Sequence, residues 1–205
     1  MTLDSTASGA GCHEAPKDMG EDPDSTTVGA QRITVAVDVR AADWPRRWPD
    51  AEAAVRQAAL AAVRAGASAI AAPDGIEISL VLADDAAVQA LNRDYLGCDA
   101  PTNVLAFPQG TESAAATPGP VLLGDVVLAL ETVSREAAAQ GKSAIDHARH
   151  LVVHGVLHLL GFDHDTAAAA TDMERREAAI LAGLGIADPY ADDKVMAAPA
   201  EAERR

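Results

Sequence analysis

The sequence predicts an α+β fold: a single domain with a small mixed β-sheet of about four strands covered by about five helices. Apolar residues make up 49% of the 205-residue chain, enough for a sizeable core. That length fits one ordinary domain with extended ends. Short β-branched segments alternate with longer segments of helical period, in the order β-α-β-α-β-β-α-α-α. This order is typical of one sheet packed against helices.

Four segments carry the β-branched or alternating pattern of strands: residues 32–39, 76–82, 103–107 and 121–129. The last of these is largely apolar, so we expect it to be a central strand, although Gly124 and Asp125 interrupt it. These patterns do not determine the order of the strands in the sheet.

Five segments have helical period: residues 51–65, 84–95, 131–140, 143–160 and 166–182. Asp50, Asp84 and Ser143 stand at the starts of three of them, where a side-chain oxygen can accept a backbone hydrogen bond. Gly161 follows the fourth helix and is expected to end it in a left-handed conformation.

The two ends of the chain are expected to be tails around a domain of residues 32–187. Residues 1–31 are rich in Ser, Thr, Gly, Asp and Pro, and this composition predicts disorder. Residues 188–205 are expected to be loose. Of the formal net charge of −15, −5 lies in residues 1–31 and −2 in residues 188–205, which leaves −8 on the domain. A domain this acidic argues against broad, unspecific binding of RNA.

The expected location is the cytoplasm, with no membrane attachment. The chain has no run of about 18 uncharged apolar residues and no apolar stretch near its start that resembles a signal peptide. Its two cysteines, Cys12 and Cys98, are not expected to form a structural disulfide, because Cys12 lies in the predicted tail.

A cluster of histidines is the strongest functional signal. His154 and His158 are four residues apart on a predicted helix, so both imidazoles lie on one face of it. Gly161 lets the chain turn, which brings His164 back toward that pair. Three neutral imidazoles with an open fourth position are what a catalytic zinc site requires. We therefore predict one Zn²⁺ ion bound by His154, His158 and His164.

The spacing of these histidines, with glycine at the seventh position after the first, also matches that of the metzincin zinc proteases. Those enzymes place a Glu general base directly after the first histidine, where this chain has Gly155. The base must come from elsewhere, or the chemistry differs.

Other polar residues have less specific interpretations. His147 and His150 are expected to be structural or to support the metal ligands from outside. Asp125 could orient a histidine, but a structural role is favoured, and Asp163 could fix an imidazole tautomer or cap the turn. Thr102 and Asn103 could bind substrate phosphate or cap a strand. Arg175 and Arg176 are expected to lie on a solvated helix face.

The segment from His154 to His164, HGVLHLLGFDH, resembles the signature of the YbeY family, bacterial endoribonucleases and rRNA maturation factors. Further segments agree in order along residues 32–190: LNRDY at 91–95, PTNVLAFP at 101–108, LGDVV at 123–127, QGK at 140–142 and DPY at 188–190. The resemblance implies a zinc-dependent, single-strand-specific endoribonuclease. Its role would lie in 16S rRNA 3′-end maturation and ribosome quality control, with rRNA and the small subunit or assembly proteins as partners.

The chain departs from the family pattern at two positions. Leu96 stands where the family usually has a functionally important Arg, and Ala106 where it commonly has Ser. Leucine cannot contact phosphate through charge, and Arg93, about one helical turn earlier, is the candidate to replace that group. The resemblance thus gives His154 and Arg93 as the candidate catalytic residues.

Three functions remain open from the sequence: a metal-dependent endoribonuclease, a zinc peptidase, and a non-catalytic ribosome-assembly factor whose metal only stabilises the fold. The missing Glu after His154 argues against the peptidase. The acidic domain and Leu96 keep the assembly factor in consideration. The RNA target, the metal and the oligomeric state do not follow from the sequence.

Overall fold

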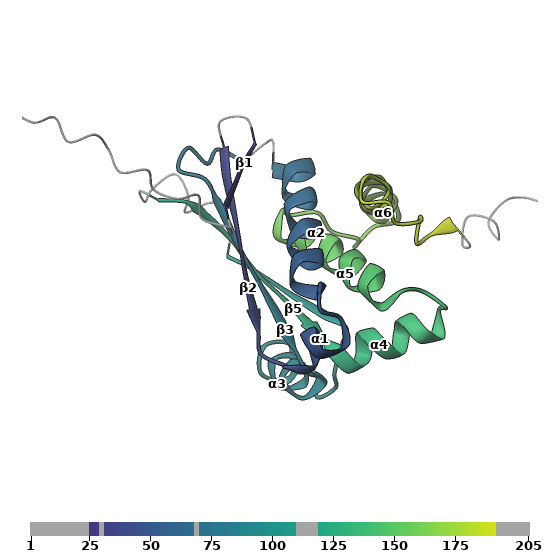
Figure 1. Cartoon of the computed structure of the whole chain (residues 1–205). Coiled ribbons are helices and arrows are strands. Elements are labelled where there is room, and N and C mark those ends of the chain that lie inside the picture. The colour runs from purple at the N-terminus through teal and green to yellow at the C-terminus, as the bar shows by residue number, and fades with distance from the viewer. Residues whose placement is uncertain (1–24, 29–30, 68–69, 110–118, 192–205) are drawn as a thin grey trace, which may run out of the picture.

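A computed structural model describes residues 25–28, 31–67, 70–109 and 119–191 (Figure 1). These residues form five strands: β1 (Ser25–Val28), β2 (Gln31–Val39), β3 (Ile76–Ala83), β4 (Val104–Pro108) and β5 (Val121–Ala129). They also form six helices: α1 (Asp43–Arg47), α2 (Ala51–Gly66), α3 (Asp85–Leu96), α4 (Leu130–Ala139), α5 (Ala144–Leu159) and α6 (Ala167–Gly183). The predicted single-domain α+β fold is confirmed.

The strands form one mixed sheet in the order β1-β2-β3-β5-β4. The pairs β2–β3 and β3–β5 are parallel, whereas β1 and β4 run antiparallel to their neighbours at the two edges. The apolar strand β5 is internal, as expected. Its interruption has a physical reason: Gly124 has φ +131°, and a Cβ there would lie 2.1 Å from the Phe107 carbonyl oxygen on β4. Only glycine permits this close approach of the edge strand.

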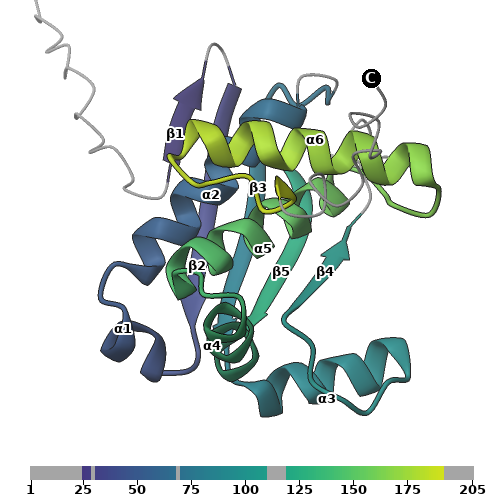
Figure 2. The same cartoon turned by 90° about the vertical axis from the view of Figure 1, so that its right-hand side faces the viewer.

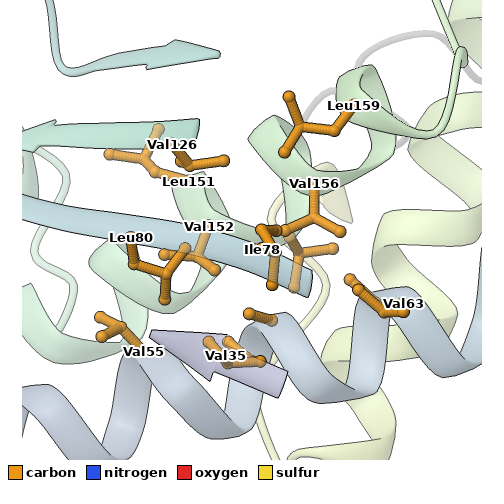
Figure 3. Packing of buried hydrophobic residues seen from close by; sticks show 14 of the residues in the cluster. Val35, Val55, Val63, Ile78, Leu80, Val126, Leu151, Val152, Val156 and Leu159 are labelled. Carbon is orange, nitrogen blue, oxygen red and sulfur yellow. The ribbon is translucent and has the colours of Figure 1, made fainter. Parts of the chain in front are cut away.

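The main core lies between one face of the sheet and helices α2 and α5. Figure 3 shows Val35, Leu80 and Val126 of the strands packed against Val55 of α2 and Val152 of α5. Many of the buried positions on α2 are alanines, which lets this helix lie close to the sheet. Helix α6 packs across α5 on the outer side (Figure 2). These contacts hold α5 between the sheet and α6.

Helix α3 covers part of the opposite face, where a smaller apolar cluster forms. Val88 of α3 packs there against residues of three strands: Val81, Leu105 and Val127. The remainder of this face is more open, because α2, α5 and α6 all lie on the other side (Figure 1).

Most predicted boundaries agree with the structure to within one or two residues. Asp84, Ser143 and Thr166 cap α3, α5 and α6 through their side-chain oxygens. Asp50 stands at the N-cap of α2 but makes no side-chain hydrogen bond there, so that capping prediction was wrong. The short helix α1 was not predicted. Its five residues carry no periodic signal, and buried Trp44 fixes it by donating to the Ala83 carbonyl oxygen.

Both predicted tails need a changed boundary. Ser25–Val28 forms β1, which pairs with β2 from Ser25 opposite Thr34 to Val28 opposite Gln31. Its run of β-branched residues is too short to stand out from the polar segment before it. At the other end, the Tyr190 side chain is half-buried against α5 and α6, so residues 188–191 are not loose. Residues 1–24 and 192–205 of the predicted tails lie outside the described residues.

In the part of the chain that the structure describes, no helix is both long enough and apolar enough to cross a membrane.

Candidate metal centre

The three predicted histidines come together at the C-terminal end of α5. His154 and His158 lie one turn apart on that helix, and Gly161 follows it with φ +87°. The Gly161 amide donates to the His158 carbonyl oxygen and the Phe162 amide to that of Leu157, so the turn satisfies the last carbonyl groups of the helix. The reversal places His164 beside the pair, as the left-handed glycine predicted.

One imidazole nitrogen from each of His154, His158 and His164 lies within 4.8 Å of the other two. The Nε2 atoms of His154 and His158 are 3.1 Å apart. A tetrahedral zinc ion with Zn–N bonds of about 2.0–2.1 Å holds its ligand nitrogens about 3.3 Å apart, so this spacing suits such an ion. These three side chains could therefore hold one metal ion.

The protonation of His158 favours the same role. Burial lowers the pKa of His158, and repulsion from His154 and His164 lowers it further, against a smaller raising effect of Asp163. The neutral form, which has the lone pair that a metal requires, is thus the stable form around neutral pH.

Glu177 on α6 orients the first histidine. One carboxylate oxygen lies 2.8 Å from Nδ1 of His154, and the other lies 2.9 Å from Nε2 of His150. An ionised carboxylate only accepts hydrogen bonds, so His154 carries its proton on Nδ1 and directs the Nε2 lone pair toward His158 and His164. His150 lies outside the three-histidine cluster and contacts it through Glu177.

The environment of Glu177 keeps it ionised. Its side chain is 1% exposed, and burial alone would raise its pKa. Hydrogen bonds from His150, His154 and Tyr190 outweigh burial and lower the pKa of Glu177 to about 2. Tyr190 donates its hydroxyl to this carboxylate, and burial together with Glu177 raises the pKa of Tyr190.

Glu177 and Tyr190 were missed as site residues in the sequence. The signal for Glu177 was present, because it lies on the buried face of α6 with Met173, Ile180 and Leu181. A carboxylate at an apolar position of a helix requires a buried partner. The partner of the Glu177 carboxylate depends on how α6 crosses α5. The sequence pattern does not reveal that crossing geometry.

A groove of about 410 Å³ opens onto the histidines, here called the metal groove. Its walls come from the end of α5 and the turn after it, from strand β4, and from Leu96 at the end of α3. The lining residues are Leu96, Val104, Leu105, Ala106, Pro108, His154, Gly155, His158, Gly161, Phe162 and Asp163. The sites of both departures from the family pattern, Leu96 and Ala106, thus face the metal groove.

Arg93 does not line the metal groove. Its guanidinium lies 3.1 Å from Asp94 and 3.8 Å from Asp99 at the surface of α3. Among the described residues that line the groove, none is Lys or Arg. Arg176 of α6 lies close by, with its guanidinium 4.5 Å from the centre of the Phe162 ring, which is part of the groove wall.

The position after the first histidine has no room for a side chain. A Cβ on Gly155 would lie 2.8 Å from Cγ1 of Val126 on β5. Glycine here lets α5 rest directly on the sheet. A glutamate base of the metzincin type has no place at this position.

The other candidate residues lie around this centre in supporting positions. Asp163 accepts a hydrogen bond from the His164 amide and so caps the turn. Asn103 accepts from the Val104 amide and donates to Glu136, which also bonds buried His147. Asp125 makes no hydrogen bond to a histidine within the described part of the chain, and its structural role remains a prediction.

Comparison with known proteins identifies the family. The family model described as "Endoribonuclease YbeY" matches residues 46–185. A protein of that name from Paramagnetospirillum magneticum is 54% identical over 163 residues, which cover 78% of this chain and 97% of that protein. The protein of the same name from Rhodospirillum rubrum is 56% identical over 165 residues, which cover 78% of this chain and 82% of that protein. A third, from Rhodopseudomonas palustris, is 43% identical over 188 residues, covering 88% and 92%. By this match and these identities, the chain belongs to the endoribonuclease YbeY family.

Proposed function

We propose that this chain is a zinc-dependent, single-strand-specific endoribonuclease acting in 16S rRNA 3′-end maturation and ribosome quality control in the cytoplasm. The observation that carries the proposal is the three-histidine cluster, of which His154 and His158 line an open groove. The relatives named endoribonuclease support RNA as the substrate.

In this proposal His154, His158 and His164 would hold the metal ion, which would supply Lewis-acid activation of water and of the phosphoryl group. Glu177 holds the His154 ring in the tautomer that binds metal.

The groove walls provide little positive charge for the phosphate that reacts. Phosphoryl transfer develops negative charge on the phosphate oxygens, which a guanidinium would stabilise. Arg93 remains a hypothesis for this role, although its ion pairs with Asp94 and Asp99 must break for it to reach the groove. Leu96 leaves the expected cationic position without charge, so we expect slow cleavage.

The two alternatives make different demands on the site. A peptidase of the metzincin type needs a carboxylate next to His154, and Gly155 packed against Val126 leaves no space for one. A non-catalytic assembly factor would bind the metal only to stabilise the fold, and activity measurements separate that case from ours.

The test compares cleavage of a labelled single-stranded RNA, the same RNA in a duplex, and casein. We expect cleavage of single-stranded RNA alone, loss of cleavage with a chelator, and recovery when zinc is added back. His154→Ala should abolish both metal binding and cleavage. His147→Gln, on the same helix but outside the cluster, should keep both. Full metal loading without any RNA cleavage would favour the assembly factor, and cleavage that survives chelation would exclude our mechanism.

A further inference from the structure

An exposed aromatic pair lies next to the metal groove and has no role in the site described so far. Tyr95, near the end of α3, is 70% exposed. Its ring meets that of Phe107 on β4 edge-on, with the ring centres 5.2 Å apart and the planes at 61°. We call these two residues the aromatic shelf. The edge-on contact fixes the tyrosine ring while leaving most of it open to solvent.

A second cavity, of about 370 Å³, opens over the aromatic shelf on the sheet face that α3 partly covers. Arg40, Gln109 and Asp125 provide its polar lining, and Leu91 and Val127 are among its apolar residues. The cavity therefore combines an open ring face with a cation and with hydrogen-bonding groups of both kinds.

The shelf cavity and the metal groove adjoin at the edge of the sheet. Pro108, the last residue of β4, lines both cavities. At the end of α3, Tyr95 lines the shelf cavity while its neighbour Leu96 lines the metal groove. A flexible chain lying along the edge of β4, which pairs with no described strand other than β5, could contact both at once.

We propose that the aromatic shelf binds one nucleobase of a single-stranded RNA whose phosphodiester lies in the metal groove. This inference rests on the proposed endoribonuclease function. Every nucleobase has a flat π-face that stacks on an exposed aromatic ring, and proteins use this contact to bind single strands with little sequence preference. A base in a duplex has both faces covered by its neighbours, so the shelf accepts only a base that has left the stack.

The charges around the shelf fit a stacking contact better than broad electrostatic attraction. Arg40 lies 2.8 Å from Asp38, and Asp125 lines the same cavity, so these groups together carry no net positive charge. The domain as a whole is acidic. Stacking lets such a surface bind RNA without a large basic patch.

The experiment measures cleavage and binding of a short single-stranded RNA by the metal-loaded full chain. Tyr95→Ala should raise KM and Kd on the order of tenfold, the loss expected for one stacked base, with kcat changed less than KM. Tyr95→Phe keeps the ring and should stay within about twofold of wild type. Leu122→Ala is the matched control, because Leu122 is 48% exposed on the sheet but lies outside both cavities. Metal content and melting temperature should be equal in all four proteins.

A scan of abasic substitutions along the same RNA identifies the stacked base. At one position near the cleaved bond, the abasic RNA should lose a similar factor with the wild type and nothing further with Tyr95→Ala. If the wild type cleaves RNA but the scan is flat, or if Tyr95→Phe behaves like Tyr95→Ala, the shelf is not a base-binding site. If the metal-loaded wild type neither binds nor cleaves RNA, the proposed function itself fails.

Discussion

Glu177 is a single buried side chain that holds one of the three clustered histidines in place without belonging to the cluster. Both of its oxygens accept hydrogen bonds from histidines, and Tyr190 adds a third. We expect Glu177→Gln to lower zinc affinity about 10–100-fold, because the amide cannot hold both imidazoles in the same tautomers. Competition with a chromogenic chelator measures this affinity.

The matched control for Glu177 is Asp172 on the same helix, whose carboxylate pairs with Arg175 and Arg176 instead of with a histidine. Asp172→Asn should bind zinc as the wild type does. If both variants bind equally well, Glu177 serves only the packing of α6.

Substitutions at Leu96 show whether a positive charge at this position of the metal groove stabilises the reacting phosphate. It is 66% exposed and lines the metal groove, so a longer cationic side chain can be added there without repacking the core. We expect Leu96→Arg to raise the rate of RNA cleavage without a change in metal content, and the uncharged Leu96→Gln to have little effect. If Leu96→Arg is neutral and Arg93→Ala abolishes cleavage, then Arg93 already holds this role.

At the scale of elements, the metal centre depends on how closely α5 lies on the sheet. A Cβ on Gly155 would meet Val126 at 2.8 Å, so Gly155→Ala should lower the free energy of unfolding by about 1–3 kcal/mol. Gly183, also helical, has open space at its Cβ position. Gly183→Ala should therefore be neutral or slightly stabilising. Chemical denaturation compares the two, and partial rescue of Gly155→Ala by Val126→Ala would confirm the contact.

At the scale of the whole molecule, the free energy of unfolding should fall at low pH because Glu177 becomes protonated. The pKa of Glu177 is about 2 in the folded protein, against 4.5 for an ordinary glutamate, so the unfolded chain takes up the proton first as the pH falls. Stability from Glu177 is fully present above about pH 4.5 and is lost as the pH falls toward 2. We expect this to cost the metal-free protein on the order of 3 kcal/mol of unfolding free energy. Urea unfolding at several pH values should show a smaller loss in Glu177→Gln.

The domain boundary at the N-terminus can be tested by truncation. Residues 1–24 have a composition that cannot bury a core, so a chain beginning at Ser25 should melt within a few degrees of the full chain. A chain beginning at Gln31 also loses β1 and its four pairs with β2, and should melt lower. Equal melting of both truncated chains would show that β1 adds nothing to the domain, and a large loss on removing residues 1–24 would show that this segment packs on it.

Local patterns in the sequence determined much of this protein. The four-residue spacing of His154 and His158, the glycine at 161 and the capping residues act within one or two helical turns, so their geometry follows from helix rules alone. The same holds for the apolar strand β5, whose composition predicted an internal position.

Only the tertiary structure decided which helices, strands and side chains contact one another over long distances in the sequence. The order β1-β2-β3-β5-β4, the contact of Glu177 with His154, and the place of Leu96 in the groove rather than Arg93 all join residues far apart in the chain. Such contacts depend on how helices cross and strands pair, and a periodic pattern gives the buried face of an element but not its partner. The three histidines that could hold a metal ion could therefore be predicted from the sequence, whereas the residues that orient them and the surfaces around them could not.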